Sequence, residues 1–151
     1  MYILYQMPCM NYLYTQPALH FLVEMGGRKN KFKMKIAKAF INAANGIGHC
    51  IRGEINFKIQ LVVAITAIIL GIFFNISTTE WLFVISCSML VLSFELLNTA
   101  LENVCNIITK EIHPVIKIVK DVAAGAVLVS AIGSAIIGVI IFLPKIIHQL
   151  K

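Results

Sequence analysis

Residues 122–143 read VAAGAVLVSAIGSAIIGVIIFL, and this stretch decides the fold because it carries no charged side chain. A helix of about 20 apolar residues is long enough to cross the hydrocarbon core of a bilayer. Two further runs, nearer the N-terminus, are almost free of charge. The sequence therefore predicts an all-α membrane protein whose spans lie at about 56–75, 81–105 and 115–143.

The composition of the whole chain agrees with a membrane protein. Of its 151 residues, 59% are hydrophobic and 13% are charged, whereas soluble domains average about 45–50% apolar and about 25% charged residues. These proportions exclude an ordinary soluble globule, a disordered chain, a coiled coil and a disulfide-rich miniprotein. The four cysteines form no CxxC pair, so we expect small apolar side chains rather than a disulfide or a zinc site.

The positions of the basic residues predict how the chain crosses the membrane. Loops rich in lysine and arginine stay in the cytoplasm. The loop at 75–80 has no basic residue, whereas Lys110, Lys117 and Lys120 follow the second span. We therefore predict a cytoplasmic N-terminus and second loop, with the first loop and the C-terminus outside. A basic cluster before the first span fits this topology and attraction to anionic lipid rather than nucleic-acid binding. It consists of Arg28, Lys29, Lys31, Lys33, Lys35 and Lys38.

The segment before the first span is predicted to be an amphipathic helix that lies in the membrane interface. Residues 33–52 place apolar side chains at steps of three and four, on one helical face. These side chains are Ile36, Phe40, Ala43, Ala44, Ile47 and Ile51. Residues 1–27 fit no such pattern and form an uncertain N-terminal extension. They are either an extra peripheral segment or, as we expect, an artefact of the assigned start, with translation beginning at Met25 or Met34. The integral-membrane domain is then 28–151.

One acidic residue inside a predicted span indicates a functional site. Glu95 lies within 81–105, where an ionisable side chain is costly and indicates function by default. Asn98 and Glu102 follow three and seven residues later, so all three share one helical face. The predicted topology brings this stripe to the cytoplasmic membrane surface together with three residues near other helix ends. These three are Glu54, Lys120 and Asp121.

The chemistry of these side chains leaves three interpretations open. In the first, Glu54 and Glu102 share a Mg²⁺ ion, which prefers oxygen ligands, while Glu95 acts as a general base and a lysine binds phosphate oxygens. In the second, the groups satisfy one another inside a helical bundle. In the third, they line a pathway for protons or other ions. The residues alone do not separate these interpretations.

The last predicted span carries a ridge of small residues, which recur at every fourth position. Such a ridge allows helices to approach closely, so it is compatible with self-association as well as with packing inside one chain. The ridge consists of Ala126, Ser130, Ser134 and Gly138.

Four segments of the chain resemble one known family. They are GEINFKIQ at 53–60, FELLNTALENV at 94–104, HPVIKIVKDVAAGAVL at 113–128 and IIFLPKI at 140–146. Together they resemble the prokaryotic diacylglycerol kinase/undecaprenol kinase family, whose members are small integral-membrane lipid kinases with an interfacial helix and three spans. The resemblance covers about 33–147. The chain has no Walker A loop, and neither has that family.

The resemblance implies a role for each matching residue. Glu95 would be the catalytic base that takes the proton from the lipid hydroxyl, and Glu54 and Glu102 would be the Mg²⁺ ligands. The expected lipid-binding residues are Glu95, Asn98, Asn56 and Gln60. The expected ATP-binding residues are Glu54, Glu102, Glu111, His113, Lys120 and Asp121. The resemblance also implies a homotrimer in the bacterial inner (cytoplasmic) membrane.

The predicted function is therefore an ATP- and Mg²⁺-dependent kinase that phosphorylates the primary hydroxyl of undecaprenol or diacylglycerol. The alternative is a small proton-coupled membrane transporter or a scaffold without kinase activity. A transporter would place its acids near the bilayer midplane, whereas these cluster at one surface. Two positions depart from the family pattern: Asn106 replaces an aspartate found in many relatives, and Gln60 replaces a histidine or glutamate.

Overall fold

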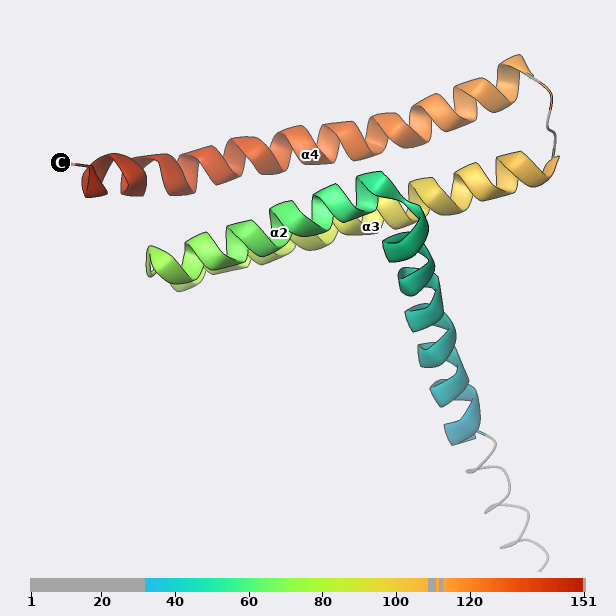
Figure 1. Ribbon diagram of the computed structural model, residues 1–151, viewed down its shortest axis with the longest axis horizontal. Coiled ribbons are helices and arrows are strands. Elements are labelled where there is room, and N and C mark those ends of the chain that lie inside the picture. The colour runs from blue at the N-terminus through green and yellow to red at the C-terminus, as the bar shows by residue number, and fades with distance from the viewer. Residues whose placement is uncertain (1–31, 109–110, 112, 151) are drawn as a thin grey trace, which may run out of the picture. The chain divides into compact units, whose positions relative to one another are not determined.

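The computed structural model describes residues 32–108, 111 and 113–150, and this part of the chain is helical and contains no strand (Figure 1). Three helices follow one another, namely α2 (Ile55–Phe73), α3 (Thr78–Ile108) and α4 (Pro114–Gln149). All three are long and apolar enough to cross a membrane. The predicted all-α membrane protein with three spans is confirmed.

The helices differ from the predicted spans mainly at their ends. α3 begins at Thr78 rather than 81, and α4 continues to Gln149 rather than ending at 143. The added turn of α4 carries His148, a residue type that suits the negative end of a helix dipole. Pro114 starts α4 because its fixed φ suits the first helical position and its missing N–H has no helical partner there.

The tight turn between α2 and α3 is a Schellman motif. Asn75 adopts a positive φ of 47°, a left-handed conformation that asparagine tolerates better than most residues. The Ile76 amide donates to the Gly71 carbonyl and the Asn75 amide donates to the Ile72 carbonyl, each at 3.2 Å. These bonds satisfy carbonyls that the end of α2 would otherwise leave without partners.

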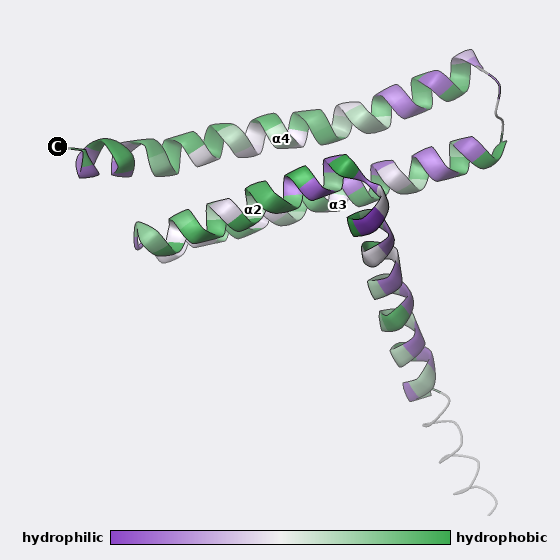
Figure 2. Ribbon diagram, viewed as in Figure 1, coloured by the Kyte–Doolittle hydropathy of each residue, from purple (hydrophilic) through white to green (hydrophobic). Residues whose placement is uncertain are grey.

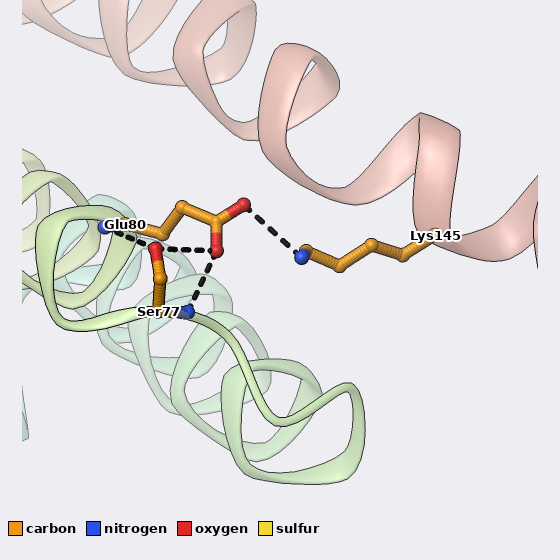
Figure 3. Close-up of polar contacts among 3 residues, drawn as sticks. All are labelled: Ser77, Glu80 and Lys145. Atoms are coloured by element: carbon orange, nitrogen blue, oxygen red, sulfur yellow. Dashed lines mark hydrogen bonds and ion pairs between the residues drawn. The ribbon is translucent and has the colours of Figure 1, made fainter.

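A capping box starts α3 and is joined to α4 by an ion pair (Figure 3). The Ser77 amide and hydroxyl both donate to Glu80 Oε2, at 2.7 and 2.9 Å, and the Glu80 amide donates to Ser77 Oγ at 3.4 Å. The pattern S-x-x-E is the usual signature of this cap. Lys145 Nζ lies 3.1 Å from Glu80 Oε1, so the cap also contacts the far end of α4.

The buried apolar core lies near this turn. It is formed by side chains from the turn, α3 and α4, namely Ile76, Val84, Ile141 and Phe142. α3 packs against both α2 and α4. Away from the core, most large apolar side chains are exposed. Figure 2 shows α2 and most of α3 and α4 as mainly hydrophobic, with hydrophilic residues toward the end of α3 and the start of α4. This is the pattern expected of helices whose outer surfaces face lipid.

The predicted amphipathic helix at 33–52 corresponds to helical residues 32–53. The chain divides into two compact units, residues 1–46 and 47–151. On the first unit the side chains of Ile36 and Phe40, which belong to the predicted apolar face, are exposed. The expectations for residues 1–27 lie outside the described residues.

The close approach of Gly71 to the capping segment generates a prediction about stability. A Cβ added at Gly71 would lie 2.9 Å from Trp81 Cη2 and 3.0 Å from Ile76 Cδ1. Overpacking of this kind costs about 1–3 kcal/mol. We expect Gly71→Ala to lower the midpoint of thermal unfolding in detergent.

Gly133→Ala is the matched control, because a Cβ there meets no atom within 4 Å. Both changes gain the same helix propensity, roughly 1 kcal/mol in alanine's favour, so the difference between them isolates the contact with Trp81. Equal unfolding midpoints for the two variants would contradict the prediction.

Candidate functional site

α3 carries a stripe of buried polar side chains in its second half. Glu95, Asn98 and Thr99 are 3, 6 and 4% exposed, and they are the buried polar residues of the described chain. Glu102, one turn beyond Asn98, is half-buried. In Figure 1, α3 and α4 both continue past the point where α2 begins, so α2 does not cover the last turns of α3.

The side chain of Asn98 binds Glu102 through its amide nitrogen, whereas its amide oxygen makes no hydrogen bond among the described residues. Its Nδ2 donates to Glu102 Oε1 at 3.0 Å. Its Oδ1 is buried and accepts no hydrogen bond within the described residues. Buried acceptors without a partner are rare because losing the hydrogen bonds to water is costly. Asn98 Oδ1 is therefore suited to accept a hydrogen bond from a ligand hydroxyl.

Glu54 occupies the break between the helix at 32–53 and α2. Its backbone is extended, with φ −100° and ψ 118°, and its side chain makes no capping bond. The ammonium of Lys58 instead donates to the Arg52 carbonyl at 3.0 Å and satisfies the end of the preceding helix. The Glu54 carboxylate thus stays available for a ligand.

Two further carboxylates lie near enough to Glu95 for their charges to act on it. The charges of Glu102 and Glu54 both act on the buried carboxyl group of Glu95. Glu95 and Glu102 come from the same face of α3, whereas Glu54 comes from the start of α2. Three like charges in a partly buried place repel one another, so this cluster favours binding of a cation.

One candidate residue from α4, Lys120, contacts α3 next to the stripe. Lys120 Nζ donates to Asn106 Oδ1 at 2.7 Å, and Asn106 lies one turn beyond Glu102 on α3. Asp121 is exposed, as are Glu111 and His113 before α4. These residues therefore lie at the end of the stripe that is farthest from Glu95 along α3.

The two candidates from α2 do not join the carboxylates through any hydrogen bond among the described residues. Asn56 is exposed. Gln60 lines a cavity of about 330 Å³ whose walls come from α2, α3 and α4 and are mainly apolar. Sequence reasoning missed the buried Thr99, and its position next to Asn98 in a span was the available signal.

The carboxylates of the site suit a magnesium ion whose remaining ligands come from a bound phosphate and from water. Within the described residues, no three His, Cys, Asp or Glu side chains gather closely enough to hold a metal by themselves. Mg²⁺ is usually held by one or two carboxylates, with phosphate oxygens and water as its other ligands. The half-buried Glu54 and Glu102 can supply those carboxylates.

Comparison with known proteins identifies a family that this chain resembles. A family model described as prokaryotic diacylglycerol kinase matches residues 41–142. The undecaprenol kinase of Bacillus subtilis is 42% identical over 109 residues, which cover 72% of this chain and 89% of that protein. The diacylglycerol kinase of a Synechocystis species is 32% identical over 123 residues, which cover 80% of this chain and 70% of that protein. The family match contains the whole carboxylate cluster.

Proposed function

This chain belongs to the prokaryotic diacylglycerol kinase family of integral-membrane lipid kinases, and we propose that it transfers the γ-phosphate of ATP to the primary hydroxyl of undecaprenol. The choice of lipid rests on the higher identity and coverage of the relative named undecaprenol kinase. Diacylglycerol is the second candidate, because the other relative is named for it.

The observation that carries the mechanism is the buried Glu95 carboxylate beside two further carboxylates. We assign Glu95 as the general base. It accepts the proton of the lipid hydroxyl while the hydroxyl oxygen bonds to the γ-phosphorus and the bond from that phosphorus to the ADP oxygen breaks. Asn98 Oδ1, which is buried without a partner, accepts a hydrogen bond that orients the substrate. Positioning and electrostatics do most of the work in such transfers.

Glu54 and Glu102 would hold Mg²⁺ against the phosphates of ATP. The bound ion would neutralise phosphate charge and so reduce its repulsion by the carboxylates. Glu102 is held in place by the Asn98 amide, and Glu54 is fixed at a helix start with its side chain uncommitted. We place the rest of the nucleotide near the start of α4, where the candidates are Lys120, Asp121, Glu111 and His113.

We further propose a location, an orientation and an oligomeric state. The basic cluster at 28–38 supports a cytoplasmic N-terminus, and both relatives come from bacteria, which supports the bacterial inner membrane. The exposed apolar face of the helix at 32–53 supports interfacial binding. The small-residue ridge on α4, where Ala126 is exposed and Ser130, Ser134 and Gly138 are half-buried, is compatible with close helix packing between copies, and we take the assembly to be a homotrimer. Asn56 and Gln60 would contact the lipid from α2.

The proposed reaction is tested directly by phosphate transfer. Purified protein in detergent with Mg²⁺ and γ-labelled ATP should label undecaprenol faster than diacylglycerol. Labelling of diacylglycerol alone would overturn the choice of lipid. Failure of the folded protein to label either lipid would overturn the kinase and favour the alternative of a proton-coupled transporter or scaffold.

Glu95→Gln should remove the base without changing the size of the side chain. We expect the turnover rate to fall by about 10²–10⁴-fold, the usual contribution of a positioned general base. Nucleotide affinity should stay close to that of the unmodified protein. Glu80→Gln is the matched control, since Glu80 lies on the same helix within the capping box, and it should retain full turnover.

Glu54→Gln and Glu102→Gln should act through the metal. Each removes one anionic oxygen donor, so each should raise the Mg²⁺ concentration that gives half-maximal activity by roughly tenfold or more. Removal of Mg²⁺ by a chelator should abolish transfer in the unmodified protein, and added Mg²⁺ should restore it. An unchanged Mg²⁺ dependence in both variants would refute the assignment of these ligands.

A further inference from the structure

Asn106 is the residue that joins the polar stripe of α3 to α4. Its Oδ1 accepts a hydrogen bond of 2.7 Å from Lys120 Nζ, across 14 positions of the sequence. Asn106 follows Glu102 by four residues, so it continues the face that carries Glu95, Asn98 and Glu102. The bond therefore sets where the Lys120 ammonium lies relative to the carboxylates.

We propose that Asn106 is a positioning residue: its amide oxygen orients the Lys120 ammonium toward the phosphate oxygens of the nucleotide and does not neutralise its positive charge. This inference rests on the proposed function. An ammonium group has three donors, and Asn106 uses one of them. The other two remain able to bind anionic oxygens.

The neutrality of Asn106 is what gives it this role. An amide oxygen orients the ammonium through a hydrogen bond but leaves its positive charge uncompensated. A carboxylate at the same position would form an ion pair with Lys120 and would also repel the phosphates. Each carboxylate added near the bound phosphates lowers the local positive potential, and a lower positive potential weakens the affinity for an anionic nucleotide.

The hydrogen bond also limits the freedom of a long side chain. A free lysine loses rotamer freedom when it binds a ligand, and this loss of entropy opposes binding. Lys120 is half-buried and already held by Asn106, so part of this ordering is complete before a nucleotide binds. Loss of the bond should therefore weaken nucleotide affinity more than it changes the chemical step.

Two variants of Asn106 test the proposal, with Asn103 as the matched position. Asn106→Leu removes the acceptor, and Asn106→Asp keeps the shape but adds a charge. Asn103 is exposed on the same turn of α3, so Asn103→Leu and Asn103→Asp make the same changes away from Lys120. The measurements are equilibrium binding of MgATP to the full-length protein in detergent, and KM and kcat for lipid phosphorylation.

Both Asn106 variants should raise the Kd and the KM for MgATP by about three- to tenfold, as expected for an exposed hydrogen bond to a charged group. The value of kcat should change less than KM, and the unfolding midpoint should stay unchanged. Both Asn103 variants should bind MgATP like the unmodified protein. Equal effects at the two positions would overturn the proposal, since a general change of charge or packing would then explain them.

A double-mutant cycle separates positioning of Lys120 from a structural role. Lys120→Met should itself weaken MgATP binding, and adding Asn106→Leu to it should change the Kd by less than about twofold. A full additional loss would show that Asn106 acts without Lys120 and would overturn the inference. Because the readout is nucleotide binding, this outcome is independent of whether either lipid is phosphorylated, which tests the proposed function separately.

Discussion

The whole molecule depends on the absence of water inside a bilayer. Backbone amides and carbonyls there must bond to one another, and a helix does this within one segment. The three apolar stretches of this chain are therefore helices, and the places where helices begin or end are where polar groups become exposed. The capping box at Ser77 and Glu80 and the free carboxylate of Glu54 both occur at such places.

The same constraint explains why so few charges define the site. A carboxylate within a span is tolerated where other polar groups or a ligand compensate its cost. Glu95 is buried among helices, and the negative charges of Glu102 and Glu54 act on it, so a bound cation would relieve the repulsion between these carboxylates. In the proposed mechanism this arrangement would serve the kinase directly, because a metal ion held by the carboxylates would bind the phosphates of ATP at the membrane surface. The fold thus holds mutually repelling carboxylates whose repulsion a bound cation would reduce.

Much of this could be predicted from the sequence, because in a membrane the local pattern and the fold are closely linked. Runs without charge predict spans, and steps of three and seven place Glu95, Asn98 and Glu102 on one face. The helix ends were less certain, since caps extend a helix past the apolar run, as at Thr78 and Gln149. The pattern S-x-x-E at 77–80 would have predicted the earlier start of α3, although nothing in it predicts the ion pair with Lys145.

By itself, the sequence determined the class of protein, the number of spans, the family resemblance and the polar face of α3, because each of these follows from composition or from spacing along one helix. The tertiary structure alone decided which groups from different helices meet. It brought Glu54 near enough for its charge to act on Glu95. It also left Asn98 Oδ1 buried without a hydrogen-bond partner among the described residues, and it paired the Lys120 ammonium with the amide oxygen of Asn106. Contacts of this kind depend on how helices pack against one another, and no pattern within a single helix contains that information.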